Sequence, residues 1–469
     1  MAIHHGTQAL KGLGAHCKRG HQATRDDRFG RLFPDLAPAY VPADVLAEIG
    51  KQGGPMDGGK KASRTKTVPV GHVFFGQFVD HDITLDLTSS LGAVADEGLP
   101  NFRTPTLDLD CVYGAGPEDA PFMYVQGGPF GGAKLLTGAD VDPGDVATAN
   151  DLLRSVNGRA IIGDHRNDEN GIVSQLQLAM IRFHNDICDK IHAATGAEGH
   201  DLYVEARREV TWHYQWGVVN DFLVAMCGDA VVWDILSCGR KYYCPVEPFI
   251  PVEFSVAAYR FGHSMAPMKI QIQSGAKAFE LFGTELGNGF SPVASQDAIV
   301  DWRELMFFPD KAGVQLAEKM DTKLATDLLD LPFITSGESS LATRNLLRGN
   351  SFLLPGGDKV AELMGRHPKE IQAVRDKVEK MSKGRIREGI PLWLYILAEA
   401  GEVGRENHEG KFEKGEGLGP VGARIVAEVL IGLLEEDPRS YLGANRNWVA
   451  DPDYDSIGKI LVSTNSSIF

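Results

Sequence analysis

The feature that most constrains the fold is a long helical periodicity that begins at Val173. Apolar side chains recur there at steps of 3, 4, 3, 4 and 4 residues, which places them on one face of an α-helix: Val173, Leu176, Met180, Phe183, Ile187 and Ile191. Residues 202–226, 371–381 and 421–434 have similar patterns, whereas strand-like alternation is scarce and short. The sequence therefore predicts a mainly α fold with long loops and little β structure.

Glycine and proline are concentrated in the segments that connect these helices. Over the first 70 residues, short apolar groups alternate with Gly, Pro and Lys, which predicts an irregular segment wrapped around a core. The sequence contains no internal repeat and no low-complexity linker. We therefore expect an N-terminal arm over residues 1–30 and one large domain over residues 31–469.

The composition excludes several classes of protein. A chain of 469 residues with 43% hydrophobic residues can bury a large core, which excludes a disordered chain and a small disulfide scaffold. A net charge of −16 argues against nucleic acid as a partner. No apolar stretch approaches about 18 residues, so we expect no membrane span. Because no signal peptide is recognisable, we expect a protein that is cytoplasmic or exported by a non-classical route.

The six cysteines include no C-x-x-C pair, which excludes zinc-ribbon and thioredoxin-like sites on spacing alone. We interpret them as small buried hydrophobic residues. Cys238 and Cys244 are close enough in sequence to close a short loop.

A polar trio interrupts an apolar stretch over residues 71–84. On a helix, Gln77 and His81 lie one turn apart on the same face, with Asp80 beside them. The neighbouring side chains are Val, Phe and Ile, so the trio points into an apolar environment, where burying three polar groups is costly. A functional site is therefore favoured here over a single satisfied core histidine.

Two other polar segments are ambiguous when taken alone. Residues 163–170 lead into the helix that starts near Val173, and acidic groups at a helix N-terminus are usually solvated. Residues 259–267 place His263 three positions after Arg260, which is weak evidence for a ligand.

A glycine pattern near the C-terminus matches the dinucleotide fingerprint G-x-G-x-x-G. The fingerprint requires an apolar strand directly before it, and the preceding residues EGKFEKGE form none. A glycine-rich turn that leads into a buried helix is the favoured interpretation of Gly417, Gly419 and Gly422.

In their order and spacing, the polar segments together resemble the animal-type haem peroxidases of the peroxidase–cyclooxygenase superfamily. The matching patterns are G-Q-x-x-D-H-D at 76–82, R-x-x-E at 166–169 and R-x-G-H at 260–263, with further matches at 104–114 and 345–348. The resemblance covers roughly residues 30–460. The missing signal peptide and the RNDEN sequence look more like a bacterial member than a secreted vertebrate one.

The resemblance implies a haem b whose iron is bound by His263. Asn345 would accept the other ring N–H of His263 and orient the imidazole. His81 would be the acid–base on the opposite face of the haem. Arg166 would polarise the O–O bond of bound peroxide, and Gln77 would hold a water or halide.

The same resemblance assigns the remaining polar groups around the haem. Arg260 and Arg348 would pair with the haem propionates. Asp80 and Glu169 match two carboxylates that form ester bonds to the haem, so we expect covalent attachment on exposure to peroxide. The implied calcium site consists of Asp82, Thr104, the carbonyl of Thr106, Asp108 and Asp110.

The sequence departs from the family pattern in three places. Phe75 stands where a Trp is usual. Asn170 stands where some mammalian members have a Met that forms a third bond to haem, so that bond should be absent and chloride oxidation is in doubt. Asp110 stands where Ser is usual, which adds an acidic group.

The expected function is reduction of hydrogen peroxide and oxidation of small donors, such as phenols, iodide, bromide or thiocyanate, through an oxoferryl intermediate. The first alternative is a fatty-acid dioxygenase of the same superfamily. Those enzymes have a radical-forming Tyr three residues before the proximal His, where this chain has Arg260, with Tyr259 one position away. The second alternative is a non-catalytic adhesion-type homologue.

Overall fold

The computed structural model describes residues 29–60, 63–85, 103–286, 289–308 and 313–465. Helices dominate it, and three two-stranded antiparallel sheets are the only sheets among the described residues. The prediction of a mainly α fold with little β structure is therefore confirmed. Of the predicted N-terminal arm, only Phe29 and Gly30 lie within the described residues.

The helices run along the chain in the following order: α2 Ala43–Gly50, α3 Gly71–Ile83, α4 Asp110–Tyr113, α5 Gly116–Asp119, α6 Val146–Ala149, α7 Gly171–Thr195, α8 Gly199–Gly217, α9 Leu223–Cys227, α10 Asp229–Cys238, α11 Trp302–Leu305, α12 Leu341–Ser351, α13 Gly357–Leu363, α14 Pro368–Met381, α15 Leu392–Glu402, α16 Pro420–Glu436, α17 Tyr441–Ala444 and α18 Ile457–Ser463. The paired strands are β1 Arg64–Pro69 with β4 Leu316–Glu318, β2 Lys269–Ile270 with β3 Phe279–Glu280, and β5 Arg405–Glu406 with β6 Phe412–Glu413.

All four periodic segments form helices. The segments at 173–191, 371–381 and 421–434 lie within α7, α14 and α16. The segment at 202–226 forms α8 and α9, which are separated by a π-helical turn, Val218–Phe222. Single π-turns inside helices often occur at functional sites. Here Phe222 from the turn packs against α3.

The prediction of an irregular segment over the first 70 residues is wrong at two places within its described part, helix α2 and strand β1. Val45, Leu46 and Ile49 are spaced to lie on one helix face, and α2 buries them against α12. Strand β1 pairs with β4, about 250 residues later in the chain. Both elements are short, and their stability comes from these distant partners.

The glycine pattern near the C-terminus serves helix packing. A Cβ on Gly419 would lie 2.4 Å from Cγ of Glu399 in α15, so only glycine allows this approach. The buried carboxyl group of Glu399 accepts hydrogen bonds from the backbone N–H groups of Val421 and Gly422 at 3.0 and 3.4 Å. A carboxyl group of the protein itself therefore occupies the N-terminus of α16.

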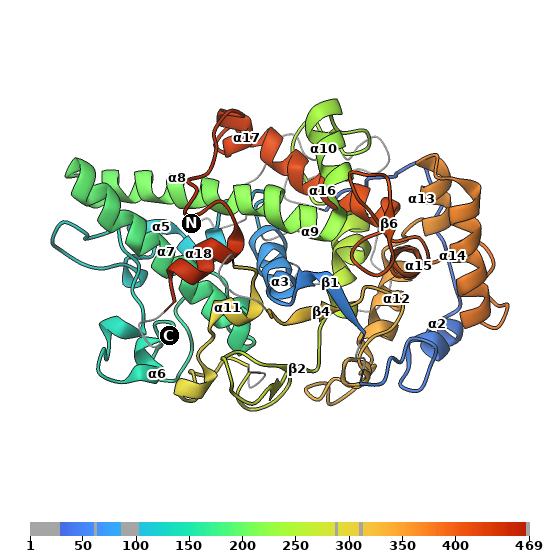
Figure 1. Cartoon of the computed structure of the whole chain (residues 1–469), viewed down its shortest axis with the longest axis horizontal. Coiled ribbons are helices and arrows are strands. Elements are labelled where there is room, and N and C mark those ends of the chain that lie inside the picture. Colours follow the sequence, from blue (N-terminus) through green and yellow to red (C-terminus); the bar gives the residue numbers. More distant parts are fainter. Residues whose placement is uncertain (1–28, 61–62, 86–102, 287–288, 309–312, 466–469) are drawn as a thin grey trace.

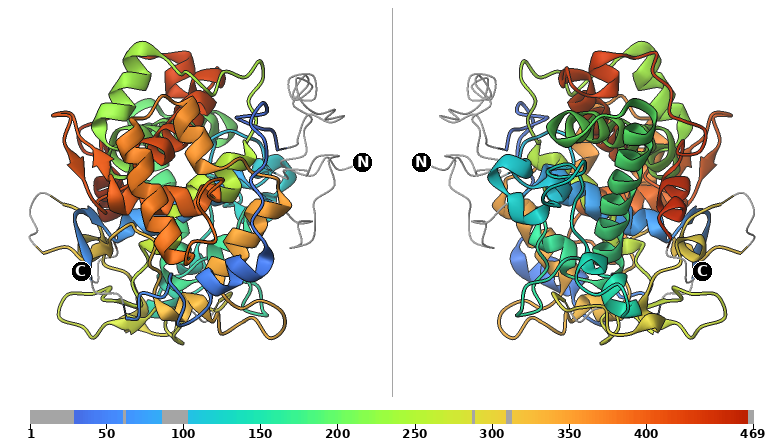
Figure 2. Two further views of the ribbon diagram at one scale, coloured as in Figure 1. Left: turned by 90° about the vertical axis from the view of Figure 1, so that its right-hand side faces the viewer. Right: turned by 90° about the vertical axis from the view of Figure 1, so that its left-hand side faces the viewer.

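The long helices enclose α3, which lies near the middle of the molecule (Figure 1). Helices α12 to α14 cover one end of the molecule, and α7 and α8 with the loops before them cover the other (Figure 2). Ten of the residues of α3 are buried, and the helix contacts both α7 and the 3₁₀-helix η7 (Ala258–Ser264). No helix in the described ranges is both long and apolar enough to cross a membrane.

Of the cysteines that the structure describes, Cys111, Cys188 and Cys227 are buried, as expected for small hydrophobic residues. Cys238 and Cys244 are exposed and free, so they do not close the loop between them in this structure.

Candidate functional site

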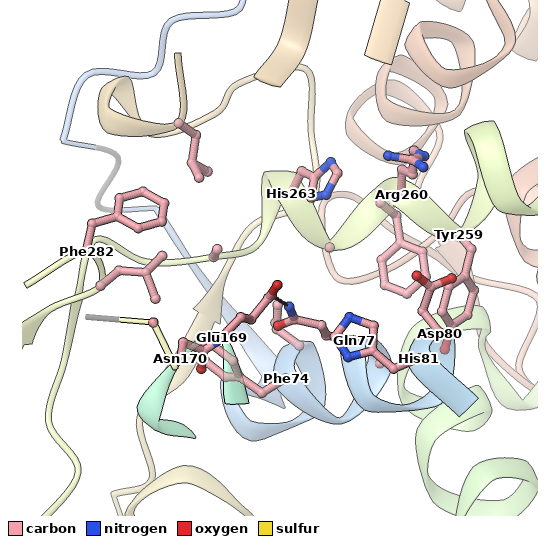
Figure 3. Close-up of a pocket in the computed structure, with 18 of the residues that line it drawn as sticks. Phe74, Gln77, Asp80, His81, Glu169, Asn170, Tyr259, Arg260, His263 and Phe282 are labelled. Atoms are coloured by element: carbon pink, nitrogen blue, oxygen red, sulfur yellow. Dashed lines mark hydrogen bonds between the residues drawn. The ribbon is translucent and has the colours of Figure 1, made fainter. Parts of the chain in front are cut away.

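A cavity of about 680 Å³ lies between α3 and η7. This volume is within the usual range for small-molecule sites, roughly 300–1,000 Å³. Its polar lining comes from three segments that are distant in sequence: Gln77, Asp80 and His81 from α3, Glu169 and Asn170 from the start of α7, and Tyr259, Arg260 and His263 from η7. The three polar segments of the sequence analysis thus meet in one place (Figure 3).

Helix α3 presents its polar residues to the cavity because its other faces are apolar and closely packed. Phe75 and Phe78 are buried and pack edge-on against Tyr214. Gly76 lets the ring of Phe222 approach, since a Cβ there would lie 3.0 Å from that ring. The Phe75 ring therefore fills a core position, consistent with its replacing the larger Trp.

His81 is held by a chain of side-chain amides. Its Nδ1 lies 2.7 Å from Oδ1 of Asn167, whose Nδ2 donates to Oε1 of Gln177 at 2.8 Å. Nε2 of Gln177 in turn donates to the carbonyl of Cys111. Because an amide oxygen only accepts, Nδ1 of His81 carries the ring proton, and Nε2 keeps its lone pair.

Burial keeps both cavity imidazoles neutral. Loss of solvation, together with the charge of Arg166, lowers the pKa of His81 to about 3. Loss of solvation and the charge of Arg260 lower the pKa of His263 to about 3 as well. At neutral pH each ring therefore carries one proton and one lone pair on its two nitrogens.

His263 contacts Asn345, but with the opposite polarity to the one predicted. The amide nitrogen Nδ2 of Asn345 lies 2.8 Å from Nδ1 of His263, where the amide oxygen was expected. The amide oxygen instead accepts from Nη1 of Arg260 at 3.3 Å. The reason is that a guanidinium group has only donors and therefore takes the oxygen.

The guanidinium of Arg166 does not line the cavity; it closes the end of α3. It pairs with Asp164 at 2.7 Å and donates to the carbonyls of His81 and Thr84 at 3.0 and 2.6 Å. Cations are favoured at this negative end of a helix. The predicted role of Arg166 in polarising peroxide stays a prediction.

The comparisons with known proteins agree with this geometry. The family model described as animal haem peroxidase matches residues 95–388. This protein belongs to the animal haem peroxidase family. Membership implies a haem, and His81 and His263 both line the cavity.

The curated relatives of this peroxidase-family chain are distant. It is 26% identical to dual oxidase 1 of Caenorhabditis elegans over 270 residues, which are 54% of this chain and 18% of that protein. It is 27% identical to human thyroid peroxidase over 260 residues, which are 51% of this chain and 27% of that protein. The chain thus spans less than a third of the length of either relative.

Solved structures show that the fold is shared over nearly the whole chain. Peroxidase A from Dictyostelium discoideum superposes with a TM-score of 0.65 at 14% identity, over 100% of this chain and 98% of that one. A fatty acid alpha-dioxygenase from Arabidopsis thaliana superposes with a TM-score of 0.62 at 17% identity, over 94% and 76% of the two chains.

Two carboxylates of this family member face the cavity. Gln77 donates through Nε2 to Oε1 of Glu169, and Thr84 donates to Oδ1 of Asp80 at 3.0 Å. Loss of solvation raises the pKa of Glu169 to about 7 and also raises that of Asp80. Asp80 lies beside Tyr259 and Arg260, and Glu169 lies nearer the opposite end of the cavity (Figure 3).

The pairing of Arg348 with a haem propionate stays a prediction. Arg348 is on α12, three residues after Asn345, and its guanidinium lies 5.3 Å from the ring centre of Phe352. It is not among the described residues that line the cavity. Asn170 lines the cavity and caps α7, since its Oδ1 accepts from the N–H groups of Ile172 and Val173.

Three of the five predicted calcium ligands come together at the end of α3. The carboxylates of Asp82, Asp108 and Asp110 each place an oxygen within 4.8 Å of the others. Thr106 donates to the hydroxyl of Thr104 at 3.0 Å on the same loop. Hard oxygens at such spacing suit Ca²⁺.

The donor set of this cluster fits a bound cation. One oxygen of Asp82 accepts from the backbone of Leu109 and from Tyr214, and its other oxygen is buried without a hydrogen-bond donor in the described ranges. Burial and the neighbouring carboxylates Asp108 and Asp110 raise the pKa of Asp82 well above its usual value. A divalent cation would relieve this repulsion.

Sequence reasoning missed the residues that hold the others in place. Asn167, which orients His81, lies inside the R-x-x-E pattern and was not assigned a role. Asp164 binds both Arg166 and Arg103 and is fully buried at its carboxylate. A sequence signal for both was present, because a buried His and a buried Arg each need a partner.

Proposed function

We propose that this protein is a haem peroxidase that reduces hydrogen peroxide and oxidises small donors. The observation that carries the proposal is the pair of neutral imidazoles, His81 and His263, which face one cavity from α3 and η7 (Figure 3). Each ring is held at Nδ1 by a buried asparagine. One imidazole is thus available as a metal ligand and the other as a base.

When bound, a haem would supply the electrons that reduce the O–O bond and would regain them from donors. The balance is one peroxide and two donors AH giving two waters and two donor radicals. His263 would hold the iron through Nε2, which requires the proton on Nδ1. A half-turn of the Asn345 amide would place its oxygen opposite that proton, and Arg260 would then pair with a propionate.

On the opposite side, His81 is prepared to move a proton. Its Nε2 would accept a proton from the first oxygen of peroxide and return it to the departing oxygen, while Asn167 holds the ring in one tautomer. Gln77 would bind a water or halide beside it. Arg166 contributes a permanent positive charge next to His81.

Three further features belong to the proposal. Asp80 and Glu169 would form ester bonds to the haem after exposure to peroxide. Asp82, Thr104, the carbonyl of Thr106, Asp108 and Asp110 would bind Ca²⁺. The donors would be phenols, iodide, bromide or thiocyanate, and a bacterial source remains part of the proposal.

The decisive experiment is the absorption spectrum of haem-supplied protein before and after equimolar peroxide. We expect a ferric Soret band that loses intensity with peroxide and regains it when a phenol or iodide is added. Absence of the band would mean that His263 is not an iron ligand. A band that does not respond to peroxide would remove the roles of His81 and Arg166.

A fatty-acid dioxygenase is the second candidate, because Tyr259 is a phenol in the cavity wall whose hydroxyl has no hydrogen-bond partner among the described residues. The position three residues before His263 is nevertheless Arg260, which donates to the carbonyl of Ser255. Oxygen uptake with linoleate in the absence of peroxide would favour this candidate. Low turnover with either substrate at full haem occupancy would favour a non-catalytic homologue.

A further inference from the structure

Phe282 lies at the end of the cavity away from Asp80 and Tyr259, the end to which Glu169 and Asn170 are also nearer (Figure 3). Among the described residues, five phenylalanines line the cavity. Four of them are grouped here, namely Phe74, Phe282, Phe290 and Phe333, whereas Phe261 lies on η7 beside Tyr259. Phe282 and Phe333 meet edge to face with ring centres 6.0 Å apart. Phe333 is 63% exposed and Phe290 is 37% exposed, so these two rings mark where the cavity opens to solvent. We call this set of four rings the mouth.

The backbone at Phe290 is strained. Its φ of 59° lies in the left-handed region, which a bulky side chain rarely adopts. Its N–H donates to the carbonyl of Asp168 at 2.6 Å, which holds the loop against the start of α7. Strain of this kind persists where the surroundings require one conformation, and such positions cluster at ligand sites.

A positive charge lies beside the mouth. The guanidinium of Arg159 lies 5.0 Å from the ring centre of Phe290, and the exposed imidazole of His165 stacks near the same ring at 6.3 Å. Within the described part of the chain, Arg159 makes no ion pair. Its neighbour Arg154, by contrast, is paired with Asp151 and Asp168.

This arrangement is unusual on a chain of net charge −16, which on average repels anions. An aromatic ring bound against Phe282 and Phe333 would bury apolar surface on both sides and gain edge-to-face contacts. An anionic group on that ring would reach the guanidinium at the rim of the mouth. A haem bound between His81 and His263 would occupy part of the same cavity.

We propose that the mouth selects aromatic donors that carry an anionic group, with hydroxyphenyl carboxylates as the chemical class. Phe282, Phe290 and Phe333 bind the ring, and Arg159 binds the carboxylate. This inference rests on the proposed peroxidase function and specifies its donor. Arg159 is a specificity residue outside the set that handles peroxide.

The test is a binding measurement on haem-loaded protein without peroxide. Titration calorimetry compares 3-(4-hydroxyphenyl)propionate with its neutral amide, which differs only in charge at the end of the side chain. We expect the acid to bind about two- to fivefold more tightly, as for a single exposed ion pair. Raising the salt concentration should reduce that difference.

Variants assign the effect to residues. Arg159→Gln should remove the preference for the acid and leave the affinity for the amide unchanged. Arg208→Gln is the matched control, because Arg208 is also an exposed arginine over an aromatic ring, Trp212, outside the cavity. Phe333→Ser should weaken both ligands equally.

Equal affinities for acid and amide, or a preference that survives Arg159→Gln, would overturn the proposal. Octanoate binding as tightly as the hydroxyphenyl acid would also overturn it, because the aromatic ring would then add nothing. Binding is measured without turnover, so this result is independent of peroxidase activity. A preference for the acid in protein that does not react with peroxide would support the proposed binding site at the mouth and reject the peroxidase proposal.

Discussion

Two buried asparagines, Asn167 and Asn345, each hold one imidazole of the cavity, and they differ in what surrounds the amide. Asn167 is fixed by Gln177, so the proton on His81 has one position. Asn345 lies between His263 and Arg260, and the guanidinium takes its oxygen. A ligand that draws Arg260 away would free this oxygen for His263. The residue types alone do not decide whether His263 or Arg260 takes the oxygen of Asn345.

Replacing Asn345 tests its role as the partner of the iron ligand. Asn345→Ala should weaken haem binding by about 10- to 100-fold, the usual cost of losing such a partner. Asn345→Asp should lower the reduction potential of the bound haem, since a carboxylate makes the imidazole more basic. The exposed Asn447→Asp serves as the control. Unchanged affinity and potential in both Asn345 variants would contradict the assignment.

The two cavity carboxylates predict how the haem is attached. After peroxide treatment, mass spectrometry in acidified solvent should find haem bound to the wild-type protein. Asp80→Asn and Glu169→Gln should each remove one link, and the double variant should release all haem. Each link converts a carboxyl group, a haem methyl group and one peroxide into an ester and two waters. Complete haem release from the peroxide-treated wild type would rule the bonds out.

At the scale of elements, α3 joins two sites that are only one residue apart in sequence. His81 faces the cavity, and Asp82 faces the cluster with Asp108 and Asp110. Leu109, between the last two, is buried with φ at 57°, which turns the loop so that both carboxylates meet Asp82. We therefore expect the position of His81 to depend on the group that neutralises this cluster.

Removal of calcium should destabilise the protein and weaken haem binding. At a free Ca²⁺ concentration of 100 times Kd, binding adds about 2.7 kcal/mol to the free energy of unfolding. A chelator or Asp108→Asn should therefore lower Tm and reduce the Soret band at limiting haem. The exposed Asp119→Asn should do neither. A chelator that leaves both quantities unchanged would contradict the calcium assignment.

The buried contact between α15 and α16 predicts a pH dependence of stability. Loss of solvation raises the pKa of Glu399 to about 8, above its usual value near 4.5. Between pH 4.5 and 8, the folded protein holds a proton on Glu399 that the unfolded chain releases. The free energy of unfolding therefore falls as pH rises through this range, by at most about 1.4 kcal/mol per pH unit.

The variant Glu399→Gln does not titrate and should become more stable relative to wild type as pH rises through this range. Denaturant unfolding at several pH values measures the difference. The exposed Glu388→Gln is the control and should show no such trend. A constant difference between Glu399→Gln and wild type from pH 5 to 8 would show that Glu399 is ionised in the folded protein.

At the scale of the whole molecule, the cavity is a long-range structure. Its lining runs from Val73 to Phe333, and Asn345 holds His263 from α12. A ligand in the cavity therefore contacts segments that are spread over more than half of the length of the chain. Such a ligand stabilises the folded chain as a unit.

Haem loading should accordingly raise the Tm of the entire chain, and the increase should grow with free haem concentration. Calorimetry on apo and loaded protein measures it. His263→Ala should abolish most of the increase, while its apo form should unfold close to the wild-type apo protein. A shift confined to part of the unfolding transition would contradict this description.

The sequence by itself determined the helical fold. The apolar periodicity in α7, α14 and α16 is a local property of the sequence, and it predicts a helix whichever part of the core the helix packs against. It also identified polar groups that lie among apolar side chains, namely Gln77, Asp80 and His81. Helix α2 and strand β1 were missed, because short elements form only with distant partners.

The tertiary structure alone decided which partner each polar group takes. The guanidinium of Arg166 turns to Asp164 and the end of α3, and the amide of Asn345 gives its oxygen to Arg260. It also placed Arg159 beside Phe290, which no sequence pattern predicts. The physical reason is that several donors compete for each buried acceptor, and only the packed chain fixes the distances that decide between them.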